Sequence, residues 1–114
     1  MVTRPWVPRP GEIIKMDLNP TLGHEQANER PAVVLSAQGF NDKSSRVVCV
    51  PCTTNVKKGP WEVAISGLNQ QTVALSDQIR RMGWRARKAI QYGSATEAEM
   101  LEILGKIQAL IGIR

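Results

Sequence analysis

Glu29-Arg30-Pro31-Ala32-Val33-Val34-Leu35-Ser36 is the stretch of this 114-residue chain that constrains the fold most strongly. Pro31 fixes its own φ at about −65° and disfavours the helical region for the residue before it, so Arg30 is extended. The apolar residues that follow are typical of a strand buried on both faces. We therefore expect Arg30 at the mouth of a core strand, anchored by the core and directed at whatever lies above the strand end.

Further short strands are expected on both sides of this stretch. Apolar or alternating segments predict them at 11–18, 46–52, 61–65 and 72–84, and residues 85–92 continue the last one as a bent or hairpin strand. The polar residues 19–29 predict a long loop, and loops of this length in a compact domain often bind a ligand or gate access to a site. Residues 38–45 contain turn formers and predict a connection.

One helix is expected near the C-terminal end. Thr96 and Glu99 fit a capping box, and Gly112 is suited to end the helix. The apolar residues between them recur at helical spacing: Met100, Ile103, Leu104, Ile107, Leu110 and Ile111. Inside a helix, Gly105 costs about 1 kcal/mol of stability relative to alanine. Close packing at this position would explain why a glycine is present. Short strands followed by one amphipathic helix predict a single, mainly β domain over residues 1–114, an antiparallel barrel or sandwich with the helix across it.

The charge balance is basic, with a formal net charge of +5. A small basic domain suggests a polyanionic partner such as nucleic acid, although many basic proteins have none. Five of the 15 lysines and arginines lie within nine positions: Arg80, Arg81, Arg85, Arg87 and Lys88. No apolar run approaches the roughly 20 residues of a membrane span, and the first ten residues do not resemble a signal peptide, so we expect a cytoplasmic protein without membrane contact.

Cys49 and Cys52 have the spacing of a redox or zinc motif. Redox pairs normally open a helix, whereas these cysteines follow a predicted strand, on which residues three apart point to opposite faces. A zinc ion would need about two more ligands, and the only histidine is His24. We expect two reduced structural cysteines and neither a metal nor a cofactor.

Most catalytic signatures are absent, including phosphate loops, nucleophile elbows and carboxylate clusters. If the chain cuts RNA without a metal, it must use the 2′-hydroxyl, which requires a base, a cation on the phosphorane and a proton source for the 5′-oxygen. Arg30 suits the cation, and Thr53, at the end of another strand, can donate to a phosphate oxygen. The alternative is that Arg30 is an ordinary exposed arginine and Thr53 merely closes its strand.

Several motifs in order resemble the MazF/PemK family of endoribonuclease toxins. The matching segments are Pro10-Gly11-Glu12-Ile13-Ile14, Asn19-Pro20-Thr21-x-Gly23-His24-Glu25-Gln26, Arg30 to Ser36, Val50-Pro51-Cys52-Thr53-Thr54, Val73-Ala74-Leu75-Ser76-Asp77-Gln78 and Trp84-Arg85-Ala86-Arg87. The resemblance implies an SH3-like barrel with a C-terminal helix, working as a homodimer. It also implies sequence-specific, metal-independent cleavage of single-stranded mRNA to 2′,3′-cyclic phosphate and 5′-hydroxyl ends, with an acidic antitoxin as partner.

The resemblance also assigns residues. It places catalysis on Arg30, Thr53 and, as the acidic residue of the long loop, Glu25. It places RNA binding on Asn41, Lys57, Asp77 and Gln78. Arg80-Arg81-Met82 is more basic than the family pattern, and we expect part of the basic cluster, Arg80 and Arg87, to contact RNA phosphates. Trp61 and Trp84 are candidates either for base stacking or for core and dimer contacts.

Two other functions are compatible with the same barrel. One is a non-enzymatic toxin that binds a protein such as DNA gyrase, which would not need Arg30 and Thr53 together. The other is a catalytically silent RNA-binding module. Incubation with a defined RNA separates both from a ribonuclease.

Overall fold

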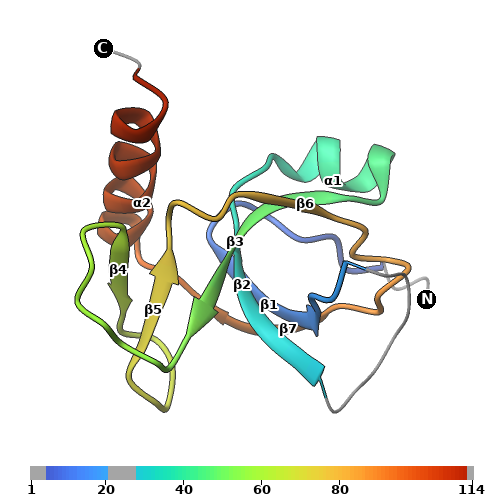
Figure 1. The fold of residues 1–114 in the computed structure, drawn as a ribbon. Helices are drawn as coiled ribbons and strands as arrows, with labels where there is room; N and C mark the ends of the chain where they lie inside the picture. The colour runs from blue at the N-terminus through green and yellow to red at the C-terminus, as the bar shows by residue number, and fades with distance from the viewer. Residues whose placement is uncertain (1–4, 21–27, 113–114) are drawn as a thin grey trace.

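The computed structural model describes residues 5–20 and 28–112 (Figure 1). In this part of the chain the elements are β1 (Glu12–Asp17), β2 (Glu29–Val34), α1 (Gln38–Ser44), β3 (Val47–Thr53), β4 (Glu62–Ile65), β5 (Thr72–Leu75), β6 (Arg80–Met82), β7 (Ile90–Ser94) and α2 (Glu97–Leu110). None of the helices described is long and apolar enough to cross a membrane.

All strand pairs are antiparallel, and the sheet curls into a half-barrel in the order β4-β5-β3-β2-β1-β7, with β6 paired to β3. The two ends of the sheet, β4 and β7, approach each other near two glycines. A Cβ atom added to Gly67 would lie 2.8 Å from the carbonyl oxygen of Ser94, and one added to Gly93 would lie 2.8 Å from Leu68. The mainly β fold with a C-terminal helix is confirmed, and the barrel rather than the sandwich is the form it takes.

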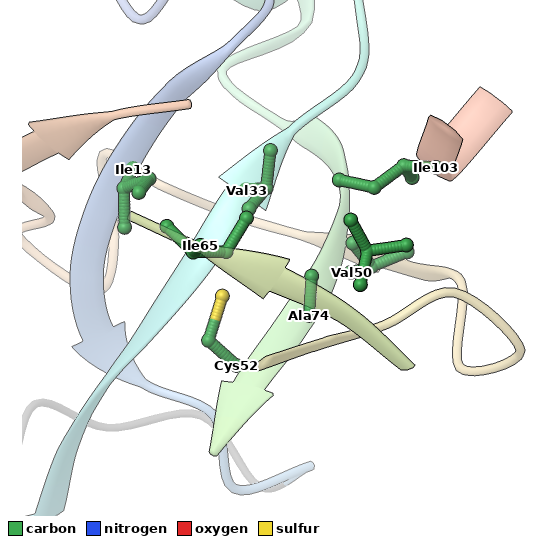
Figure 2. Close-up of a cluster of buried hydrophobic side chains, with 8 residues drawn as sticks. Ile13, Val33, Val50, Cys52, Ile65, Ala74 and Ile103 are labelled. Atoms are coloured by element: carbon green, nitrogen blue, oxygen red, sulfur yellow. The ribbon is translucent and has the colours of Figure 1, made fainter. Parts of the chain in front are cut away.

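The strands bury side chains on both faces, so there are two hydrophobic clusters. Ile13 and Val33 belong to the first cluster, which α2 closes through Ile103 (Figure 2). Ile14, Ala32 and the other residues of the second cluster lie on the opposite face, together with Trp84. This explains the continuous apolar run after Pro31: both faces of β2 are core.

Helix α2 begins with the predicted capping box. The Thr96 hydroxyl accepts from the Glu99 N–H at 3.1 Å, and the Glu99 carboxylate accepts from the Thr96 N–H at 2.9 Å. The other carboxylate oxygen of Glu99 accepts from the Ser66 N–H at 2.8 Å, which joins the helix start to the end of β4. Gly112 has a φ of 75° after the helix, as predicted.

The apolar stripe of α2 is only partly buried. Ile103 is fully buried, and Met100 and Ile107 pack against the first cluster. Leu104, Leu110 and Ile111 are exposed, so only part of the stripe faces the core. Close packing does not explain Gly105, because nothing in the described chain lies within 4 Å of an added Cβ.

Three sequence predictions of local structure are wrong. Residues 84–88 form a turn before β7 rather than the continued strand expected at 85–92, and β7 pairs with β1. Residues 38–45 form helix α1 rather than an irregular connection, because buried hydrogen bonds to distant residues stabilise a helix that local composition does not favour. The single strand expected at 72–84 is two strands, β5 and β6, separated by a turn in which the Gln78 N–H donates to the Leu75 carbonyl.

Candidate active site

Arg30 and Thr53 lie on neighbouring strands at the same end of the half-barrel. The register of β2 and β3 pairs Val34 with Cys49 and Ala32 with Pro51. The pairing ends at Ala32 and Pro51, and Arg30 and Thr53 lie two residues beyond that pair on β2 and β3. Both residues therefore lie where the pairing of β2 with β3 ends.

The Arg30 side chain is exposed and anchored at one point. Its Nη1 atom donates to the carbonyl oxygen of Glu29 at 2.9 Å. No other side-chain hydrogen bond is made to the described residues, so most of the guanidinium donors are available to a ligand. A guanidinium held in this way can bind a phosphate through two parallel hydrogen bonds.

Thr53 is half-buried and has its proton available. Its Oγ1 atom accepts a hydrogen bond from the Asn55 N–H at 3.1 Å, which orients the hydroxyl. A hydroxyl has one donor proton besides its acceptor lone pairs. The Thr53 hydroxyl is therefore positioned to donate to an oxygen in the cleft.

Two adjoining clefts surround this pair, and Leu75 and Gln78 line both of them. The first cleft, about 470 Å³, is lined by Arg30, Arg80 and the end of β1 through residues 17–20. In it, the Arg80 Nη2 atom donates to the Gln78 side-chain oxygen at 3.2 Å. Arg80 is therefore a second cation facing the same space as Arg30.

The second cleft, about 340 Å³, is lined by Thr53, Lys57, Trp61 and Asp77 among other residues. Glu62 also lines this cleft, and its carboxylate accepts from the backbone N–H groups of Lys57 and Lys58. Glu62 thus fixes the turn that carries Lys57. No sequence signal identified this role, because the alternating pattern of β4 only marks Glu62 as an outward residue.

The sequence matches the family described as PemK-like, MazF-like toxin of type II toxin–antitoxin system over residues 9–111. The chain belongs to this family. It is 47% identical over 112 residues to the endoribonuclease toxin MazF of Escherichia coli K12, covering 98% of this chain and 100% of that protein. The endoribonuclease PemK of E. coli is 30% identical over 106 residues, covering 89% of this chain and 80% of that protein.

Solved structures agree with these relatives. MazF from Deinococcus radiodurans superposes with a TM-score of 0.85 at 34% identity, covering 96% of this chain and 100% of that one. A MazE–MazF complex from the same organism gives a TM-score of 0.84 at 29% identity, with the same coverage. The predicted family and the endoribonuclease class are therefore confirmed.

One predicted site residue of this MazF/PemK family member, Asn41, is fully buried away from both clefts. Its side chain donates to the carbonyls of Pro8 and Ser36, at 2.9 and 3.0 Å, and accepts from the Ser36 hydroxyl. Its own carbonyl accepts from the Trp84 indole at 2.9 Å. These contacts hold the N-terminal arm, α1 and Trp84 together, so the structure gives Asn41 a place in the core and leaves its amide no access to RNA.

Arg87 is also buried, with 5% of its surface exposed. Its Nη1 atom donates to the carbonyls of Asp17 and Asn19, at 2.7 and 2.6 Å. Both acceptors belong to the wall of the first cleft. Arg87 therefore supports the cleft from behind rather than lining it.

The remaining predicted features fall in different places. Glu25 lies outside the described residues. Trp84 is buried, stacked edge-on against Trp6 at 5.6 Å, which makes it a core residue, whereas Trp61 lines the second cleft.

Cys49 and Cys52 are free and lie in opposite clusters, as expected, and burial raises the pKa of each thiol to about 12. No group of three metal-ligating side chains occurs within residues 5–20 and 28–112.

Proposed function

We propose that this chain is a sequence-specific endoribonuclease toxin that cleaves single-stranded mRNA without a metal ion. The observation that carries the proposal is that Arg30 and Thr53, at the ends of neighbouring strands, line two adjoining clefts in a chain 47% identical to an endoribonuclease MazF. Cleavage of mRNA would stop translation and growth in the cytoplasm.

In the proposed reaction the 2′-oxygen of one nucleotide attacks the adjacent phosphorus. The P–O5′ bond breaks, the 2′-hydroxyl proton passes to a base, and the 5′-oxygen takes up a proton, which leaves a 2′,3′-cyclic phosphate and a 5′-hydroxyl. Arg30 stabilises the negative charge that develops on the phosphorane oxygens, and the Thr53 hydroxyl donates to one of them. The arginine is the cation of this step, because a guanidinium keeps its charge in proteins and has no acceptor atom. Glu25 is the acidic residue proposed to take part in proton transfer.

The polar groups around this pair would bind the flanking nucleotides. Arg80 is suited to a phosphate beside the scissile one, and Gln78 and Asp77 offer acceptors and donors to base edges. Lys57 would attract the backbone in the second cleft, where Trp61 offers a face for stacking. Recognition of a short sequence would follow from these contacts.

The proposed partners are a second copy of this chain and an acidic antitoxin. The exposed leucines and isoleucine of α2 offer an apolar face to a subunit. An acidic, disordered antitoxin segment that folds on binding would cover the cationic clefts and block RNA. MazE–MazF complexes among the structural relatives support this arrangement.

Three variants test the proposal in a cleavage assay on single-stranded RNA with end-group analysis. Arg30→Ala and Thr53→Val should each reduce the cleavage rate by about 100-fold or more, as loss of a transition-state donor does. Thr54→Val is the matched control, because Thr54 is the exposed neighbour of Thr53 and lines neither cleft. The wild-type chain should remain fully active in EDTA and leave 2′,3′-cyclic ends.

Other outcomes would contradict the proposal. Loss of activity in EDTA that Mg²⁺ restores would exclude the metal-free mechanism. Equal effects of Thr53→Val and Thr54→Val would remove Thr53 from the site. Intact RNA with the folded wild-type chain would favour a gyrase-binding toxin or a silent RNA-binding module.

A further inference from the structure

A further cationic hollow lies beyond the two clefts, between the C-terminal end of α1 and strand β6. Figure 1 shows these two elements side by side. It is a concave site of about 260 Å³. The lining consists of Ser44, Ser45, Arg46, Arg81, Gly83, Ala86 and Arg87. We call it the β6 pocket. It contains three arginines, two serines and no carboxylate, so its field is positive.

The two exposed arginines of the β6 pocket are uncommitted. Neither Arg46 nor Arg81 makes a side-chain hydrogen bond or ion pair with the residues that the structure describes. The nearby acid, Asp42, is already engaged, since its carboxylate lies 2.7 Å from Arg85. Two guanidiniums that share a pocket without an internal anion repel each other, and an external anion would relieve this.

Strand β6 joins this pocket to the proposed catalytic cleft. Consecutive strand residues point to opposite faces, and the register pairs Arg80 with Cys49 and Arg81 with Val48. Arg80 accordingly lines the first cleft, while Arg81 lines the β6 pocket. Only one strand separates the two cationic sites, so an RNA strand that leaves the cleft past Arg80 reaches Arg81 next.

We propose that the β6 pocket binds a backbone phosphate of the RNA outside the segment that is cleaved. This rests on the proposed ribonuclease function and extends the substrate path beyond the two clefts. The forked guanidiniums of Arg46 and Arg81 suit a phosphate, with the Ser44 and Ser45 hydroxyls beside them. An acidic peptide fits less well, because the lining has no large apolar side chain to anchor it. The pocket would add affinity for long RNA without reading bases.

The test measures RNA affinity against salt in an Arg30→Ala background, in which the proposed cleavage is blocked. The probe is a fluorescent single-stranded RNA of about 20 nucleotides, long enough to leave the clefts, titrated between roughly 50 and 200 mM salt. Arg46→Gln and Arg81→Gln should each reduce the slope of log K against log salt by about 0.7, and should raise Kd about four-fold at physiological salt. The double variant should show about twice the slope change. Arg9→Gln, an exposed arginine outside the pocket, is the matched charge control and should show neither effect.

A second measurement separates binding outside the clefts from damage to them. In the active background, the Arg46→Gln/Arg81→Gln chain should cleave an RNA of about five nucleotides at the wild-type kcat/KM, and lose efficiency only on long RNA. The proposal would be overturned if the pocket variants left the salt slope unchanged, if Arg9→Gln reduced RNA affinity as much as they do, or if they slowed cleavage of the short RNA. It would also be overturned if the pocket variants bound RNA normally and instead lost affinity for an acidic antitoxin peptide. Absence of cleavage by the wild-type chain would instead refute the proposed function, and it would leave the measured slopes unaffected.

Discussion

Arg85 and Arg87 are two residues apart, and their guanidiniums have opposite surroundings. Arg85 is exposed, with hydrogen bonds of 2.7 and 2.6 Å to Asp42 and Ser45 and a position 4.5 Å from the Trp84 ring centre. Arg87 is buried and donates to two backbone carbonyls nearly 70 positions earlier in the chain. The first guanidinium competes with water for its partners. The second is a buried charged donor held by two backbone carbonyls, so its loss is the more costly.

We therefore expect different results from Arg87→Met and Arg85→Met. Arg87→Met should lower the free energy of unfolding by about 3 kcal/mol, because two carbonyls lose a charged donor. Arg85→Met, the matched control, should lower the free energy of unfolding by at most about 1 kcal/mol, because an exposed ion pair contributes no more than that. Denaturant titration checks both values. Arg87→Met should also reduce the kcat for RNA cleavage, because residues 17–20 form the cleft wall.

The same pair distinguishes support of the cleft from contact with RNA. If Arg87 bound phosphate directly, Arg87→Met would reduce the salt dependence of RNA affinity and leave stability unchanged. That result would restore the RNA-binding role expected from the sequence. The basic cluster at 80–88 could be found by counting charges, but its division among cleft, core and outer surface depends on strand register and turn geometry.

At the scale of the element, the two helices show why local sequence predicts one and not the other. Helix α2 carries its own start signal, since Thr96 and Glu99 are three residues apart and cap each other. Helix α1 has Ala37 at its N-cap and no side-chain cap. Its stability comes from Asn41, whose partner Pro8 is 33 residues away. Periodicity and capping predict α2, whereas α1 requires a tertiary contact that the sequence does not display.

Glu99 makes the start of α2 sensitive to acid. Burial raises the pKa of its carboxyl, but the hydrogen bonds from Thr96 and Ser66 outweigh burial and lower the pKa below its usual value. The folded state therefore binds this proton less readily than the unfolded state. The stabilisation is complete above the unfolded pKa of about 4.3 and is lost as the pH falls through the lower folded pKa.

We expect the Tm difference between the wild-type chain and Glu99→Gln to be largest near neutral pH and to shrink below about pH 4. Thermal unfolding followed by circular dichroism at several pH values measures it. Glu97→Gln is the matched control, because Glu97 lies in the same helical turn and no tether to Ser66 is recorded for it. A constant difference across this pH range would show that the Glu99 tether does not depend on the charged form.

At the scale of the whole molecule, the positions of the strands along the chain are more predictable than the site. Arg30 and Thr53 could be predicted as strand-end residues from Pro31 and from the change to hydroxyl side chains after Cys52. Their placement at the same end of neighbouring strands depends on the pairing of β2 with β3, which no local pattern reveals. Glu62 and Arg87 act on backbone groups of other segments, and such contacts appear only when the chain is closed.

Closure itself rests on the crossing of residues 66–69 over the end of β7. An alanine at Gly67 would place its Cβ 2.8 Å from the Ser94 carbonyl, a backbone atom that cannot yield without moving β7. At Gly93 the 2.8 Å neighbour is a Leu68 methyl group, which can rotate away. Gly67→Ala should therefore lower the free energy of unfolding by about 1–3 kcal/mol, and Gly93→Ala by less.

Gly105→Ala is the reference substitution, because an added Cβ there meets nothing within 4 Å and improves helix propensity by up to about 1 kcal/mol. Denaturant midpoints should rank Gly105→Ala above wild type, then Gly93→Ala, then Gly67→Ala. RNA cleavage by the folded fraction should be equal in all four, since neither cleft is lined by residues 66–69. If Gly67→Ala and Gly93→Ala are equally stable, the crossing is loose, and barrel closure must depend on the packing of α2 against β4 instead.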